Sequence, residues 1–382
     1  MKKDIYIYYA FSFLLGFYIA NGTTVLFERV LNFSYSQVFT LGAVYMLMFI
    51  LFEIPSGALA DLIGRKKCIA LGCLLLTAAA IASGISNTFV QLFFSFFLWA
   101  MGFSCISGAN EALLYDRVNN EEIYGKVLGK SLLLGLVGTT LAGVLGPWLF
   151  SHNFRFPYFF SAIPFFLGGL IILFFYEAKI EGKFTIRQHL MQMWSASHTA
   201  FGNKFIRWAG LFLALIFAIS YTMSNAYQPY LQNIGFNVKA FSVILPAMFL
   251  FGGFGSMASR KLYDYLGENK LFIVTLLLLA LSLGLLGLFA VKFALIALFL
   301  YSFIQGIASP LISTYSNRYI ASHERATVLS VQSMVSTVAA SLPLFLFGFL
   351  TDKFGLNNLL ITLGSIILIA GIALIITKPK AA

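Results

Sequence analysis

The chain has 382 residues, of which 60% are hydrophobic and 10% charged. Its mean hydropathy is +0.88. Soluble domains are usually about a quarter charged, so this composition excludes an ordinary soluble protein and indicates an integral membrane protein. The net charge of +11 would suit nucleic acid, but the sequence contains no aromatic–basic recognition motif, and no nucleic-acid partner is expected. The three cysteines lie in apolar segments without metal-ligand or disulfide spacing, so neither a metal site nor a cofactor is predicted.

Apolar segments long enough to cross a bilayer recur along the whole chain. A spanning helix needs about 20 predominantly apolar residues, and twelve segments meet that condition. They are 5–27, 38–59, 68–85, 89–112, 127–150, 157–176, 206–231, 238–262, 271–291, 293–316, 328–350 and 359–376. The sequence therefore predicts an all-α membrane protein with twelve transmembrane helices.

The basic residues predict the orientation of these helices. If the N-terminus is cytoplasmic, all but five of the 25 lysines and arginines face the cytoplasm, as the positive-inside rule requires. The exceptions are Arg29, Arg155, Lys239, Lys292 and Lys353. An even number of spans then places both termini in the cytoplasm, and the expected location is the cell membrane, plasma or inner, as a multi-pass protein.

A short motif joins the second and third predicted helices. Residues 57–67 have the form G-x-x-x-D-x-x-G-R-K-K, with Gly57, Asp61, Gly64 and Arg65 at the defined positions. Glycines allow two helix ends to approach closely, and the carboxylate can accept bonds from free N–H groups or pair with the arginine. The basic cluster places this turn on the cytoplasmic face.

Two further copies of this motif follow at other helix ends. A degraded copy contains Asp264 and Gly267 after the eighth helix, with Arg260 at the first glycine position and Glu268 at the arginine position. A third copy, over 348–355, contains Asp352 and ends the eleventh helix on the predicted outer side. Inverted repeats nested within each half place copies in this way.

The repeats divide the chain into two six-helix halves. We expect an N-terminal bundle over 1–176 and a C-terminal bundle over 206–382. Between them, 177–205 is the longest polar stretch, and its mixture of apolar and basic residues suits an amphipathic helix on the inner membrane surface.

Helix number, repeat placement and the motif at 57–67 together resemble the major facilitator superfamily of secondary transporters, over essentially the whole chain. The resemblance implies two six-helix bundles around a central cavity that opens alternately to each side. In that family the motif aspartate closes the outward-facing state near the eleventh helix. The resemblance therefore implies conformational gating by Gly57, Asp61, Gly64 and Arg65 and, through the copies, by Asp264, Gly267 and Asp352.

Carboxylates inside a membrane are costly and usually functional. Glu53, in the second predicted helix, and Glu111, at the inner end of the fourth, are the two candidates for a proton-coupling group. Each could instead bond a neighbouring helix end or a buried polar group. Glu28 and Arg29, at the outer end of the first helix, are predicted to form an interfacial pair.

Uncharged polar residues mark possible substrate-binding walls, because helices one, four, seven and ten line the cavity in the superfamily. Tyr18, Asn21 and Glu28 have the spacing of one helical face. The candidate substrate-binding residues are Tyr18, Asn21, Tyr221, Asn225, Gln228, Tyr301 and Gln305. The alternative is that these side chains form hydrogen bonds between helices, which polar groups in membranes commonly do.

The fifth predicted helix gives a partial resemblance to antiporters of the superfamily. It is rich in glycine and contains Gly146-Pro147, as they do, but Phe150-Ser151 replaces the glycines expected downstream. The membrane arginine that antiporters carry in the fourth helix is also missing. These departures weaken an assignment to export without removing it.

No catalytic motif is present, so the chain is not expected to be an enzyme. The first hypothesis is proton-coupled efflux of small hydrophobic or cationic compounds, with a small-molecule substrate, protons and the lipid bilayer as partners. The second is a proton-coupled symporter that imports a small metabolite, and a remote third is a non-transporting membrane receptor. A monomer is sufficient for any of them.

The motif gives a first testable prediction. Replacing Asp61 by Asn removes the charge that the gate is expected to use, so Asp61→Asn should slow transport without abolishing expression. The measurement is flux in proteoliposomes. Normal transport by a well-folded Asp61→Asn protein would count against the gating role.

Overall fold

The computed structural model describes residues 2–177, 202–320 and 325–379. Within these ranges the chain is helical and no strand is present, so the predicted all-α class is confirmed. The predicted amphipathic helix lies mostly in 178–201, outside the described residues.

The helices follow the predicted spans closely. Eleven helical stretches in the described ranges are long and apolar enough to cross a membrane, and Phe156–Ile172 is a further, shorter apolar helix. The first half contains α1 (Lys2–Gly16), η1 (Ile19–Thr23), α2 (Thr24–Val30), α3 (Tyr35–Ile63), α4 (Arg65–Ile85), α5 (Phe89–Val118), α6 (Glu121–His152) and α7 (Phe156–Ile172). The second half contains α9 (Lys204–Asn233), η2 (Val238–Ala240), α10 (Phe241–Leu266), α11 (Glu268–Leu288), η3 (Lys292–Ala294), α12 (Leu295–Arg318), α13 (Arg325–Phe354) and α14 (Leu356–Ile376).

The first predicted span is broken, although its sequence predicts one continuous helix. α1 ends shortly before Tyr18, whose backbone is extended (φ −80°, ψ 92°), and a 3-10 turn and α2 follow. The Ala20 N–H released by the break donates to the Ser161 hydroxyl at 3.0 Å. The expectation that Tyr18, Asn21 and Glu28 share one helical face is therefore wrong, because the helical turn is interrupted between them.

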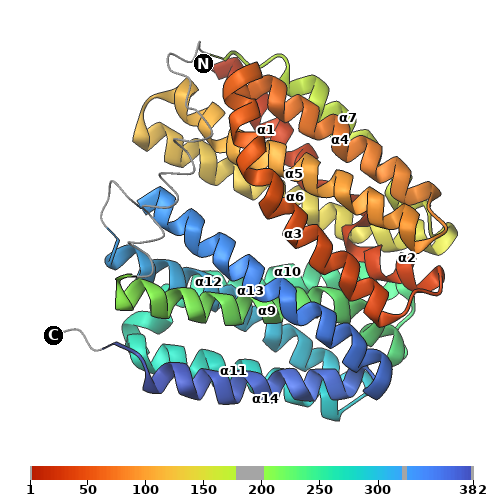
Figure 1. Cartoon of the computed structure of the whole chain (residues 1–382), viewed down its shortest axis with the longest axis vertical. Helices are drawn as coiled ribbons and strands as arrows, with labels where there is room; N and C mark the ends of the chain where they lie inside the picture. Colours follow the sequence, from red (N-terminus) through yellow and green to blue (C-terminus); the bar gives the residue numbers. More distant parts are fainter. Residues whose placement is uncertain (1, 178–201, 321–324, 380–382) are drawn as a thin grey trace. The chain divides into compact units, whose positions relative to one another are not determined.

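The described chain forms two compact units. The first contains most of α1–α7 together with Val238–Leu245, and the second contains Ser34–Ala43 with α9, the rest of α10 and α11–α14. In the first unit α4 packs on α5 and α7, and α1 packs on α6 and α7. In the second unit α11 packs on α12 and α14, and α9 packs on α13 and α14. Figure 1 shows α11 and α14 side by side. The same helix pairs therefore occur in both units, as a duplicated six-helix unit would produce.

Close helix contact in the first unit uses the glycines of the fifth predicted span. A methyl group at Gly138 of α6 would overlap the backbone oxygen of Phe13 in α1. The neighbouring Thr139 hydroxyl donates to the Gly16 carbonyl oxygen at 3.0 Å, across the same contact. Small residues that let two backbones approach are typical of helix packing in membranes.

The three motif copies share one unusual backbone conformation. Gly64, Gly267 and Gly355 have φ values of +96°, +73° and +84°, and each directly precedes a helix, namely α4, α11 and α14. Their ψ values lie between 143° and 162°, a region that is essentially restricted to glycine. The second glycine of each copy thus allows the chain to leave one spanning helix and enter the next within a single residue.

This backbone requirement predicts the effect of adding one methyl group. Gly267→Ala and Gly355→Ala should each destabilise the fold by about 1–3 kcal/mol, because the conformation disfavours a side chain even though no other atom would touch the new methyl group. Gly253→Ala is the matched control, since its site in α10 also offers open space but has no positive φ. Thermal denaturation of the purified variants measures the difference, and equal midpoints for all three would contradict the backbone argument.

Candidate functional site

The loop between α3 and α4 is held by two carboxylates. The Arg65 guanidinium forms an ion pair with Asp116 at the end of α5. The backbone N–H groups of Arg65 and Lys66 donate to Glu177 Oε1 at 2.5 and 3.3 Å. Glu177 therefore accepts the free N–H groups at the start of α4, a role that the sequence suggests only for Asp61, which is half-buried.

A second ion pair joins three helix ends of the same unit. The Nε and Nη2 atoms of Arg117 donate to Asp4 Oδ2 at 2.9 and 2.6 Å. The Tyr176 N–H donates to the other Asp4 oxygen at 3.2 Å, and the Arg117 guanidinium lies 4.6 Å from the centre of the Tyr176 ring. The first turn of α1 is thereby attached to the ends of α5 and α7.

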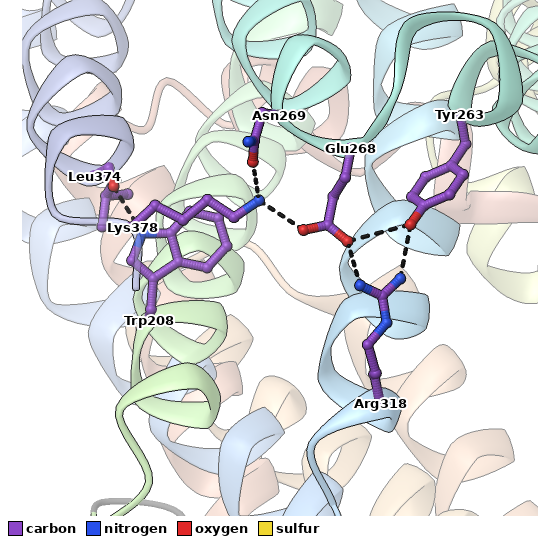
Figure 2. Close-up of polar contacts among 7 residues, drawn as sticks. All are labelled: Trp208, Tyr263, Glu268, Asn269, Arg318, Leu374 and Lys378. Atoms are coloured by element: carbon purple, nitrogen blue, oxygen red, sulfur yellow. Dashed lines mark hydrogen bonds and ion pairs between the residues drawn. The ribbon is translucent and has the colours of Figure 1, made fainter. Parts of the chain in front are cut away.

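The copy that contains Asp264 and Gly267 has the opposite arrangement of charge. Glu268, at the position of Arg65, pairs with Arg318 at the end of α12 at 2.8 Å. Arg318 Nη2 also donates to the Tyr263 hydroxyl at 2.7 Å, and Lys378 Nζ lies 2.7 Å from the other Glu268 oxygen. Figure 2 shows Glu268 at the centre of this network. Arg65–Asp116 and Glu268–Arg318 thus join equivalent helix ends, with acid and base exchanged.

The third copy caps the start of a helix. Asp352 Oδ1 accepts the Tyr35 N–H at 2.7 Å, and Oδ2 accepts the Ser36 N–H and hydroxyl at 2.8 and 2.5 Å. The first glycine of this copy, Gly348, has no room for a side chain, because a methyl group there would lie 2.9 Å from atoms of Tyr35, Ser36 and Phe39. Asp352 therefore ties the end of α13 to the first turn of α3.

The acidic residues of the spans differ greatly in burial. Glu28 is 2% exposed, and its Oε2 atom has no hydrogen-bond partner among the described residues. The Nη1 atom of Arg29 donates to the Phe33 carbonyl oxygen at 2.5 Å. The predicted interfacial pair is therefore wrong for Glu28, which is buried. Glu53 is half-buried and Glu111 is exposed.

Two tyrosines lie within electrostatic range of this buried acid, Tyr18 and Tyr158. The Tyr158 hydroxyl is also buried and has no hydrogen-bond partner among the described residues. The Tyr18 ring packs on Trp99 and Phe165, with centroids 4.7 and 5.6 Å apart. Asn21, predicted on the same face as Tyr18, is instead exposed.

The polar candidates of α9 bond mainly within their own helix. Asn225 Nδ2 donates to the Tyr221 carbonyl oxygen at 2.9 Å. Gln228 is fully buried, and its Nε2 atom donates to the Tyr227 hydroxyl at 3.1 Å. A methyl group at Gly42 would lie 3.2 Å from the Asn225 amide, so the start of α3 passes close to this part of α9.

The candidates of α12 form a link between helices. Gln305 Nε2 donates to the Tyr301 hydroxyl at 3.2 Å. The same hydroxyl interacts with Ser220 of α9. The structure therefore brings Tyr301 and Gln305 together and connects them to α9, while Tyr18 and Asn21 belong to the other unit.

Two units with the same helix pairing, together with three copies of one helix-end motif, are the organisation of a multi-pass membrane transporter. The sequence profile described as the Major Facilitator Superfamily matches residues 7–343. The chain belongs to this family.

Individual relatives agree with this assignment. An uncharacterized MFS-type transporter of Bacillus subtilis, YxaM, is 24% identical over 379 residues, covering 95% of this chain and 93% of the relative. A multidrug resistance protein of Blochmanniella pennsylvanica, MdtH, is 31% identical over 118 residues, 30% of this chain and 28% of that protein. The solved structure of the nucleoside transporter NupG has a TM-score of 0.80 at 11% identity and covers 99% of both chains.

The cap on α3 predicts a local loss of order in one variant. Asp352→Asn should lower the free energy of opening the first turn of α3 by about 1–2 kcal/mol. The reason is that an asparagine amide has no charge and only one oxygen that can accept a hydrogen bond. Hydrogen exchange in a peptide covering 34–43 should then be about 5–30 times faster.

Asp264→Asn is the matched control for this variant. Asp264 forms an exposed pair with Arg260 at 3.1 Å on its own helix, and such pairs contribute little. Unchanged exchange at 34–43 in Asp352→Asn would show that the cap does not hold α3.

Proposed function

We propose that this transporter works by alternating access and couples the efflux of small hydrophobic or cationic compounds to protons. The observation that carries the proposal is the buried carboxyl group of Glu28, whose Oε2 atom has no hydrogen-bond partner among the described residues. A charge removed from water without a partner costs several kcal/mol, so such a group is stable only when it is neutral. Binding and release of a proton at this position would therefore change the energy of the surrounding helices.

Glu28 replaces Glu53 and Glu111 as the preferred proton-coupling residue. A group that couples two events must sense both the proton and the substrate, which requires a shielded position. Glu53 is only half-buried and Glu111 is exposed, whereas Glu28 is 2% exposed. Glu53 and Glu111 stay as the competing candidates.

The proposed substrate class follows from the same cluster and from the polar residues of α9 and α12. Tyr18, Trp99 and Phe165 form a cluster of aromatic faces in the same unit as Glu28. Aromatic faces bind apolar groups and, through their negative π surfaces, cations. In the other unit, Asn225, Gln228 and Gln305 are the proposed uncharged hydrogen-bonding groups for the substrate. The partial similarity to proteins named for multidrug resistance supports this direction.

Uptake by proton symport is the second candidate. A solved D-xylose-proton symporter has a TM-score of 0.72 to this chain at 13% identity, so the fold accommodates both directions. A buried carboxyl group can serve either cycle, because it can exchange its proton for a substrate or carry both together. The sign of the coupling decides between them.

The gates of this cycle would be the motif copies. We assign the loop of Asp61 and Arg65 to the cytoplasmic side and the Asp352 cap on α3 to the outer side, as the charge distribution predicts. Breaking the three bonds of Asp352 to Tyr35 and Ser36 would free the start of α3. With this orientation both termini would be cytoplasmic. The protein would lie in the cell membrane and work as a monomer.

Glu28→Gln tests the coupling directly. Glutamine has the shape of the protonated acid, so the variant should fold with an unchanged or higher melting temperature. A thermal-shift screen on the wild type first identifies a ligand, and flux of that ligand in proteoliposomes is then measured with and without a pH gradient. In Glu28→Gln the acceleration by the gradient should fall at least about tenfold, the loss of a coupling free energy of about 1.4 kcal/mol or more.

Glu53→Gln and Glu111→Gln are the matched controls and should keep the gradient dependence. Wild-type flux that ignores the pH gradient would exclude proton coupling altogether. If Glu53→Gln or Glu111→Gln loses the dependence on the pH gradient while Glu28→Gln keeps it, proton coupling would be assigned to Glu53 or Glu111, the residues that the sequence favours.

A further inference from the structure

Lys378, in the C-terminal segment, has unusual surroundings for a lysine. Lys378 follows α14, and its ammonium group lies over three aromatic rings, 5.4 Å from the Trp208 centroid, 4.7 Å from Phe272 and 5.1 Å from Tyr315. The same atom lies 2.7 Å from Glu268 Oε1 and 2.6 Å from Asn269 Oδ1. One ammonium group thus contacts residues of α9, α11 and α12, and Figure 2 shows it beside Glu268 and Asn269 of α11.

The three rings form a rigid wall. Trp208, Phe272 and Tyr315 are 4%, 1% and 1% exposed. Their centroids lie 4.9 to 5.7 Å apart, and Trp208 and Phe272 meet edge to face at 89°. The indole N–H of Trp208 donates to the Leu374 carbonyl oxygen at 2.7 Å, which fixes the ring against α14.

The polar side of the site is equally well defined. Glu268 uses its two oxygens separately, because Oε2 accepts from Arg318 and Tyr263 and leaves Oε1 for the ammonium group. A cavity of about 680 Å³ adjoins the site and is lined by all of these side chains except Tyr263. The Tyr315 hydroxyl, buried at its wall, has no hydrogen-bond partner among the described residues.

We define the ammonium box as Trp208, Phe272, Tyr315, Glu268 and Asn269. Several aromatic faces combined with anionic or amide oxygens are the chemistry by which proteins bind organic ammonium ions. We propose that the ammonium box is a binding site for an alkylammonium group, and that its resident ligand is the chain's own Lys378. The occupied box fastens the C-terminal segment to the ends of α9, α11 and α12, and an emptied box binds a free alkylammonium ion from solution.

The test empties the box and refills it. Lys378→Ala removes three methylenes and the ammonium group, which together correspond to propylammonium. The variant should melt about 3–6 °C below the wild type. Propylammonium at tens of millimolar should restore at least half of that loss in Lys378→Ala and should not shift the wild type, whose box is already occupied.

Three controls separate the box from general effects. Propanol has the same length without charge and should not rescue, and sodium chloride at equal ionic strength should not rescue either. Lys126→Ala removes an exposed lysine paired with Glu122 and should neither lower the melting temperature nor respond to propylammonium. In the double variant Lys378→Ala/Glu268→Gln the rescue should disappear.

If that double variant cannot be purified, Lys378→Ala/Phe272→Leu removes one aromatic face and serves the same purpose. An unchanged melting temperature of Lys378→Ala would overturn the proposal, because the lysine would then not fasten the C-terminal segment to the helix ends. A loss that propanol or salt repairs as well as propylammonium would overturn it too, since the site would not recognise an ammonium group. These outcomes do not depend on proton coupling or on the transported substrate.

Discussion

The N-terminal N–H groups of helices, and the carboxylates that satisfy them, constrain this structure most directly. Each sharp turn between spans begins a new helix with free N–H groups that need hydrogen-bond acceptors. Glu177 accepts the first N–H groups of α4, and Asp352 accepts those of α3. Glu177 comes from the segment after α7 and Asp352 from the end of α13, so satisfying a helix start also connects segments that are distant in sequence.

The two units solve the same problem with opposite charges. In the first unit a base in the loop, Arg65, meets an acid at the end of α5, and in the second an acid in the loop, Glu268, meets a base at the end of α12. Exchanging the charges keeps the attraction and the helix pairing but leaves a carboxylate where the first unit has a guanidinium. Glu268 has an oxygen to spare, and Lys378 binds to it. The acid at this motif position thus gives the C-terminal segment a place to bind.

The sequence predicts the features that depend on local pattern. Hydropathy gives the spans, and glycine at positions 64, 267 and 355 predicts helix breaks that the backbone angles match. Features that arise from packing were not predictable. Nothing local distinguishes Glu28 from an interfacial acid, because its burial depends on the break after α1 and on Tyr158 of α7. The partners of Glu177 and Lys378 lie more than 100 residues away, and no spacing rule connects them.

The central claim is that a buried carboxyl group, Glu28, exchanges protons as substrate binds. The direct measurement is the number of protons released or taken up when a ligand from the thermal-shift screen is added to purified protein in weakly buffered solution. The account predicts release of about one proton per protein in the wild type and none in Glu28→Gln. Proton uptake on binding would favour symport over efflux. Equal release by wild type and Glu28→Gln, or no change in either, would contradict the assignment of Glu28.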